Sequence, residues 1–255
     1  MKKLLARERM KKAQKIILQV LAALAVIILI ISISLHKKET SYTQEELLMD
    51  TYIKITAYGT DQKVLEEAVT KAFLSIEELE KITNRYYAPG TDEYQNSDIC
   101  QLNEKAGLEE VKVSADTYEI IKKALYFGEL SQGSFNIAIG PVMDLWGFGG
   151  NNKKVPEDDL LEEALKLTNL KDIALNDEQK SVFLTKPGMK LDLGGVAKGY
   201  GAAKAAEILK TEGIEKALID AGGNIVVIGN KEPAQSWKIA IQDPSDLKKY
   251  FGVLK

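Results

Sequence analysis

The sequence has 255 residues, of which 45% are hydrophobic and 28% are charged, and its formal net charge is −3. These proportions are typical of a folded domain and exclude a disordered or fibrous chain. The single cysteine, Cys100, and the single histidine, His36, exclude an internal disulfide, a cysteine-rich zinc site and a Ser-His-Asp triad in the folded part. We expect Cys100 to be a buried apolar filler rather than a nucleophile.

The charge is unevenly distributed along the chain. Residues 1–38 hold nine basic residues and one acidic residue, whereas the other 217 residues hold 25 basic and 36 acidic residues. An acidic folded part lacks the positive surface that nucleic acids require, so nucleic acid is not an expected partner.

An apolar segment at residues 16–35 predicts a membrane anchor in the lipid bilayer. As a helix, its twenty residues would extend about 30 Å, which is the thickness of one hydrocarbon core. Seven basic residues precede it, so the positive-inside rule predicts a single-pass protein of the cell membrane with a cytoplasmic N-terminus and an extracytoplasmic folded domain. The alternative is a cleaved signal peptide, although the apolar run is longer than such peptides usually have. The expected organisation is a basic segment 1–15, the anchor 16–35, a polar tether 36–47 and a folded domain 48–255.

The folded domain begins with clear periodic signals. Residues 51–58 alternate polar and apolar side chains, which predicts a half-buried strand. Asp61 is a suitable helix cap, and apolar residues then recur every three or four positions from Val64 to Leu79. Further helices are expected at 115–130 and from Pro156 onward.

The second half of the chain alternates short strands with one long helix. Two strands are expected between 173 and 185, then a strand ending in Leu191-Asp192-Leu193, a glycine pair and a helix to about residue 210. Strands are also expected at 217–219, 225–228 and 237–241. Without a strict βαβ repeat, this order predicts an α+β fold in which mixed sheets pack against helices.

Three glycine-rich stretches are candidate functional segments. Residues 191–203 place glycines and a lysine at a strand-to-helix turn, which is typical of a phosphate site but equally of a tight turn capped by Asp192. Residues 133–150 place Trp146 and Phe148 among glycines that do not favour a regular helix, so the segment either lines a pocket for a planar ligand or packs in the core. Residues 219–230 are consistent with a plain hairpin.

The order of these segments resembles the ApbE family of FAD:protein FMN transferases over roughly residues 48–241. The match consists of five blocks in the family's order. They are Met49-Asp50-Thr51, Ser97 to Asn103, Gly133-Ser134-Phe135-Asn136 with Gly140-Pro141 through Trp146, Asp192 to Gly199, and Gly222-Gly223-Asn224.

The resemblance implies a flavin site and a magnesium ion. The residues that it places in contact with FAD are Met49, Tyr86, Ser134, Phe135, Asn136, Asp192 and Lys198. Asn136 stands where Asp is commoner, which keeps a hydrogen-bonding side chain but removes a charge. The backbone carbonyl of Gly195 corresponds to a ligand of Mg²⁺, and carbonyl oxygen suits that ion.

The reaction that the resemblance implies is phosphoryl transfer to a protein. A threonine hydroxyl of an acceptor flavoprotein attacks the FMN-side phosphorus of FAD, AMP leaves, and FMN remains attached as a phosphodiester. Such chemistry needs in-line positioning and neutralisation of the diphosphate charge, which Mg²⁺ and Lys198 would supply.

One departure from the family concerns the end of the chain. The family continues into a His-x-Ile-x-Asp-Pro-x-x-Gly motif and a later Asp and Thr that complete the magnesium site, whereas this sequence stops at Lys255. We therefore expect a chain that lacks the family's C-terminal portion, has no assigned catalytic residue and transfers FMN poorly by itself. The alternatives are a membrane-tethered flavin-binding protein without catalysis, and a structural subunit.

Overall fold

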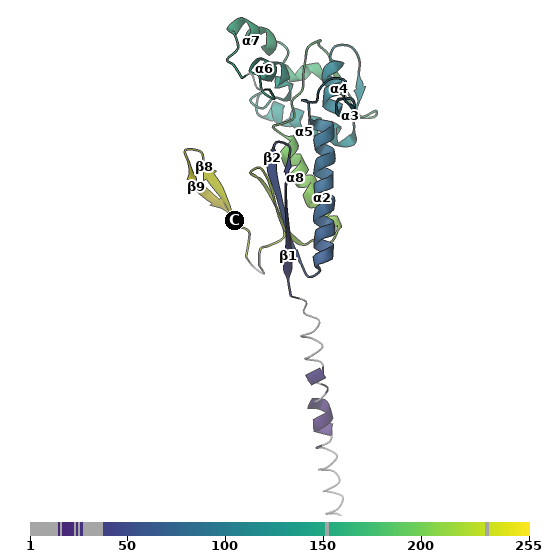
Figure 1. The fold of residues 1–255 in the computed structure, drawn as a ribbon, viewed down its shortest axis with the longest axis vertical. Coiled ribbons are helices and arrows are strands. Elements are labelled where there is room, and N and C mark those ends of the chain that lie inside the picture. The colour runs from purple at the N-terminus through teal and green to yellow at the C-terminus, as the bar shows by residue number, and fades with distance from the viewer. Residues whose placement is uncertain are drawn as a thin grey trace, which may run out of the picture. The chain divides into compact units, whose positions relative to one another are not determined.

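The computed structural model describes residues 15, 17–22, 24, 26–27, 38–150, 153–232 and 235–255 (Figure 1). The chain divides into two compact units, residues 1–40 and 41–255. Much of the predicted anchor 16–35, and the basic segment 1–15 except Lys15, lie outside the described residues. Within the described ranges, no helix is both long enough and apolar enough to cross a membrane.

A four-stranded sheet with the order β1-β2-β6-β7 forms one part of the folded unit. Its strands are β1 (Thr40–Leu48), β2 (Thr51–Gly59), β6 (Lys216–Ala221) and β7 (Asn224–Ile228). The predicted strand 51–58 is confirmed, and it pairs antiparallel with β6. Strand β1 includes residues 40–47 of the expected tether 36–47. Its mostly polar sequence suits an edge strand, in which alternate side chains are exposed.

Two long helices cover one face of this sheet (Figure 1). Helix α2 (Gln62–Thr83) begins where predicted, because the Asp61 carboxylate accepts a hydrogen bond from the backbone N–H of Lys63 at 3.1 Å. Its apolar stripe packs against β2, although Val64 is 44% exposed. Helix α8 (Ala197–Thr211) packs beside α2 through small residues. This layer holds the start of α8 in a fixed place.

The rest of the folded unit is built around a second core. It contains a three-stranded sheet with the order β3-β5-β4, and fully buried Tyr118 lies among its apolar residues. The elements are α3 (Asp92–Asn96), α4 (Asp98–Glu104), β3 (Val111–Lys112), α5 (Ala115–Leu130), η1 (Ile137–Ile139), α6 (Gly140–Leu145), α7 (Asp158–Leu165), η2 (Leu170–Asp172), β4 (Ile173–Asn176) and β5 (Ser181–Leu184). The chain ends in a separate hairpin of β8 (Ile239–Asp243) and β9 (Asp246–Leu254).

The α+β fold class is confirmed, and three local expectations are wrong. Residues 191–193 form no strand, since their backbone groups bond to side chains and loops instead of a ladder. The glycine-rich segment 133–150 does contain a short helix, α6, because Pro141 is accommodated in its first turn. Helix α7 begins at Asp158 rather than at Pro156.

Candidate functional site

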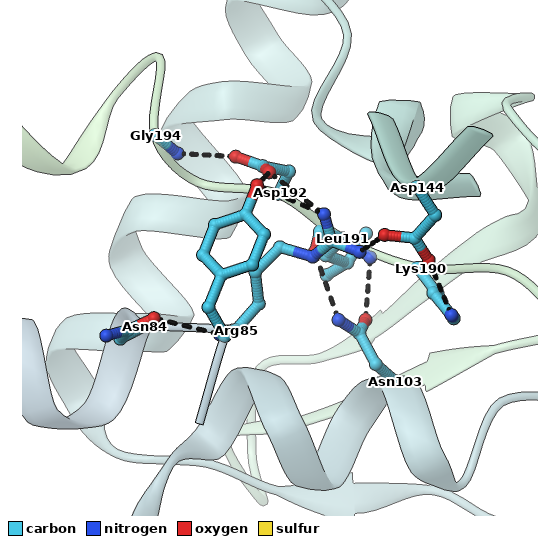
Figure 2. Close-up of polar contacts among 9 residues, drawn as sticks. Asn84, Arg85, Asn103, Asp144, Lys190, Leu191, Asp192 and Gly194 are labelled. Carbon is cyan, nitrogen blue, oxygen red and sulfur yellow. Dashed lines mark hydrogen bonds and ion pairs between the residues drawn. The ribbon is translucent and has the colours of Figure 1, made fainter. Parts of the chain in front are cut away.

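The segment 190–194 carries Asp192 and is held by contacts from other elements (Figure 2). Asn103 of α4 makes two hydrogen bonds with the backbone of Leu191: its Oδ1 accepts from the N–H at 2.6 Å, and its Nδ2 donates to the carbonyl at 3.1 Å. The next N–H, of Asp192, donates to the carbonyl of Ile137 at 2.8 Å. The segment is therefore fixed without being part of a sheet.

Asp192 is oriented by three donors. Its Oδ1 accepts from the backbone N–H of Gly194 at 2.9 Å. Its Oδ2 accepts from the Tyr86 hydroxyl at 2.9 Å and from Nη1 of Arg85 at 3.2 Å. The side chain of Asp192 is only 10% exposed. These bonds fix the orientation of the carboxylate, which can still accept a further hydrogen bond.

Arg85 was not singled out from the sequence, yet it links two parts of the site. Its side chain is 6% exposed, and its guanidinium lies between the carboxylates of Asp144 and Asp192 (Figure 2). Nη2 is 2.5 Å from Oδ1 of Asp144, and Lys190 approaches Oδ2 of Asp144 at 2.6 Å. The two acids and the two bases therefore balance one another in charge.

Tyr86 stands beside Arg85 and is held against the backbone of Gly149. A Cβ atom added to Gly149 would lie 2.2 Å from two atoms of the Tyr86 ring, so only glycine allows this approach. Burial, followed by the negative charge of Asp192, raises the pKa of Tyr86 above its usual value. The phenol is thus protonated at neutral pH and acts as a donor to Asp192.

Met49 lies in the two-residue turn between β1 and β2. Both Met49 and Asp50 have positive φ angles, 52° and 57°, which is the conformation that a two-residue hairpin turn of this hand requires. The N–H of Met49 donates to Oε1 of Glu80 at 2.9 Å. Burial raises the pKa of Glu80, although the bond from Met49 opposes this effect. The turn is therefore fastened to α2.

Lys198 lies in the first turn of α8. Its Nζ donates to the carbonyl of Gly194 at 3.1 Å, and it forms no ion pair with any residue that the structure describes. No side chain caps the start of α8 at Val196. An unpaired ammonium beside an uncapped helix N-terminus favours an anion.

Two cavities meet at this point. The larger has a volume of about 1050 Å³ and is lined mainly by α5, α8 and Phe135. The smaller has a volume of about 300 Å³ and is lined by Met49, Tyr86 and Asp192 among others. Gly194 and Lys198 line both cavities. A long ligand that occupied both would cross these two residues at its middle.

The larger cavity has one aromatic wall and one polar wall. A Cβ atom on Gly195 would lie 3.1 Å from the Phe135 ring, so the glycine lets the ring approach the backbone closely. Opposite charges meet on the polar wall, where Asp116 binds the hydroxyl of Tyr200 at 3.0 Å and the ammonium of Lys204. Burial and the bond to Asp116 raise the pKa of Tyr200 to about 12, so its hydroxyl is neutral at physiological pH.

Of the seven residues expected to contact FAD, five line the two cavities: Met49, Tyr86, Phe135, Asp192 and Lys198. Ser134 and Asn136 line neither. The Asn136 side chain caps η1 by accepting from the N–H of Ala138 at 2.8 Å, and it donates to the carbonyl of Thr168 at 2.7 Å. These bonds assign Asn136 a structural role in this structure, and contact of Ser134 and Asn136 with FAD stays a prediction.

The residues that the structure describes do not form a complete site for the expected magnesium ion. Gly195 lines the larger cavity, but no group of three or more His, Cys, Asp or Glu residues in the described part of the chain could hold a metal ion. The magnesium ion therefore stays a prediction.

Comparison with known proteins identifies the family. The model of the ApbE family matches residues 49–255. A protein of Klebsiella pneumoniae (strain 342) named FAD:protein FMN transferase is 31% identical over 214 residues, which cover 84% of this chain and 62% of the relative. One of the same name from Treponema pallidum (strain Nichols) is 31% identical over 219 residues, covering 80% of this chain and 58% of the relative.

Solved structures agree with this result. The ApbE protein of Thermotoga maritima matches with a TM-score of 0.72 and 31% identity, covering 84% of this chain and 67% of that chain. The flavin transferase ApbE of Vibrio cholerae, at 24% identity and a TM-score of 0.71 over 81% of this chain and 65% of that one, supports the fold alone. This chain thus spans about three fifths of the length of the curated relatives, and it belongs to the ApbE family.

Proposed function

We propose that this chain carries the flavin-binding part of an FAD:protein FMN transferase. In the proposed reaction, a threonine oxygen of an acceptor flavoprotein forms a bond to the FMN-side phosphorus of FAD and loses its proton. The bond to the AMP phosphate breaks, and AMP leaves. The names of the family relatives support this activity, and the single observation that carries it is the position of Lys198 where the two cavities meet.

The residues of the site suit the parts of a flavin dinucleotide. Lys198 and the uncapped start of α8 would neutralise the diphosphate. Phe135 offers an aromatic face to a planar ring, and Asp192 offers an acceptor to a hydroxyl or amino group of the ligand. The combined site is concave, largely apolar and equipped with a few fixed polar groups, as small-molecule sites usually are.

Three finer features belong to the same proposal. Magnesium would assist by neutralising charge on the diphosphate, with the carbonyl of Gly195 as one ligand. The acceptor residue would be a threonine. The apolar segment 16–35 would anchor the protein in the cell membrane, with the catalytic domain on the extracytoplasmic side.

The proposal is tested with the 255-residue chain, FAD, MgCl₂ and a flavoprotein subunit that another ApbE-family transferase modifies. Release of AMP together with a fluorescent, covalently flavinylated acceptor band is the expected result for a transferase. The acceptor's Thr→Ala variant should give neither. FAD binding without AMP release would replace the proposal with a membrane-tethered flavin-binding protein. The absence of any FAD-induced rise in melting temperature would contradict both readings and favour a structural subunit.

A further inference from the structure

A single buried guanidinium, that of Arg85, joins α6 to the segment 190–194, whose residues from Asp192 onward line the smaller cavity. Arg85 follows the last turn of α2, whereas Asp144 lies in α6 and Asp192 in the segment 190–194. Asp144 lines neither the smaller nor the larger cavity, although Arg85 and Asp192 line the smaller one. Asp144 is therefore in a position to act on the site only through other residues.

We infer that Arg85 is a positioning residue, which uses Asp144 as a remote anchor to fix the carboxylate of Asp192 for ligand binding. This inference rests on the proposed function, since FAD is the ligand used to test it. A planar guanidinium donates to two carboxylates at once along fixed directions, and its two bonds of 2.5 and 3.2 Å use that property. A lysine in its place would keep the charge and lose the bridge.

The charge balance of the cluster supports the same role. Arg85 and Lys190 compensate Asp144 and Asp192, so this group of four adds no net charge beside the cavity. Lys198, which forms no ion pair within the described ranges, remains as a cation for an anionic ligand at the place shared by the two cavities. Arg85 thus orients the carboxylate of Asp192, and Lys198 provides positive charge for the ligand.

The test compares Asp144→Asn with Asp177→Asn in the full chain, purified in detergent because residues 16–35 are apolar. Each variant removes a carboxylate that pairs with a lysine, at 2.6 Å in both cases, but Asp177 lies outside the lining of both cavities and has no contact with Arg85. We expect Asp144→Asn to raise the Kd for FAD about tenfold, the effect of losing one charged hydrogen bond, and Asp177→Asn to leave it unchanged. Unchanged or tighter FAD binding in Asp144→Asn would overturn the inference and would indicate that Arg85 contacts the ligand directly.

A second pair of variants separates positioning from simple stabilisation. Arg85→Met should lower both the melting temperature and FAD affinity, because it removes a charged donor from the largely buried Asp192 and leaves Asp144 with Lys190 alone. Arg85→Lys should recover most of the melting temperature but not the affinity. If affinity returns together with the melting temperature, the role of Arg85 is structural only. If the unchanged chain does not bind FAD, the proposed function fails instead, and the two failures are thereby distinguished.

Discussion

Asn103 and Leu191 lie 88 positions apart in the sequence and are joined by two hydrogen bonds, one from the N–H of Leu191 and one to its carbonyl. A side-chain amide takes the place of a neighbouring strand at this point. The contact explains why the resemblance includes the block from Ser97 to Asn103, although none of its residues lines either cavity. The block positions the segment that carries Asp192.

Replacing Asn103 with alanine should therefore affect both stability and ligand binding. We expect the free energy of unfolding to fall by about 2 kcal/mol, since the backbone groups of Leu191 lose their partners. The FAD affinity should fall as well, because Asp192 follows directly. Urea unfolding and FAD titration measure the two effects. Gln101 lies in the same helix as Asn103, and its side chain donates to the carbonyl of Tyr94. Gln101→Ala removes that bond and is the control, which should leave FAD affinity unchanged.

Lys198→Met tests whether the junction of the cavities binds phosphate. We expect the Kd for FAD to rise by about tenfold or more, because a charge-assisted bond to the diphosphate is lost. The Kd for riboflavin, which has no phosphate, should change little. Lys210→Met, in the exposed last turn of the same helix, is the control. Equal losses for FAD and riboflavin would contradict a phosphate role for Lys198.

Gly149→Ala and Gly90→Ala form a matched pair that tests the contact of Tyr86 with the ligand. Both glycines have similar positive φ angles, 81° and 88°, so an alanine should cost about 1–2 kcal/mol of backbone strain at either position. Only the new methyl at position 149 meets the Tyr86 ring, since nothing lies within 4 Å at position 90. Isothermal titration should show weaker FAD binding for Gly149→Ala alone; comparable affinities in the two variants would count against Tyr86.

The single thiol should be unreactive in the folded protein. Cys100 is 2% exposed, and burial raises its pKa, so little of the reactive thiolate is present at pH 8. We expect an aromatic disulfide reagent to titrate one thiol per chain in guanidinium chloride and to react very slowly without it. Prompt reaction in native buffer would mean that α4, which also carries Asn103, opens readily.

The elements that sequence reasoning located correctly have local causes. The apolar stripe and the Asp61 cap define α2, and the polar turn at 176–180 separates β4 from β5. Such signals lie within a short stretch of chain, so they can be recognised without knowledge of the fold. Strand β1 gave no such signal, because its polar sequence is acceptable only at the edge of a sheet that other segments complete.

The sequence predicted residues that line the two cavities but missed two residues that hold them in place. Met49, Tyr86, Phe135, Asp192 and Lys198 came from the family resemblance and do line them. Arg85 and Asp144 were missed, since a lone arginine after a helix has no periodic signal and its partners are 59 and 107 positions away. Asn136 also has a local task that the sequence did not reveal, the cap of η1, and its contact with FAD stays a prediction.

The left-handed backbone conformation of Met49 strains the β1–β2 turn, and the Met49 side chain lines the smaller cavity. A side chain with a Cβ atom is disfavoured in that conformation by about 1 kcal/mol, so glycine at position 49 would relieve the strain, although it would also remove a side chain that packs against both hydrophobic cores. The same change would remove the Met49 side chain from the lining of the smaller cavity. The backbone conformation of the turn by itself would favour glycine, whereas methionine accepts the strain and keeps a side chain in the cavity.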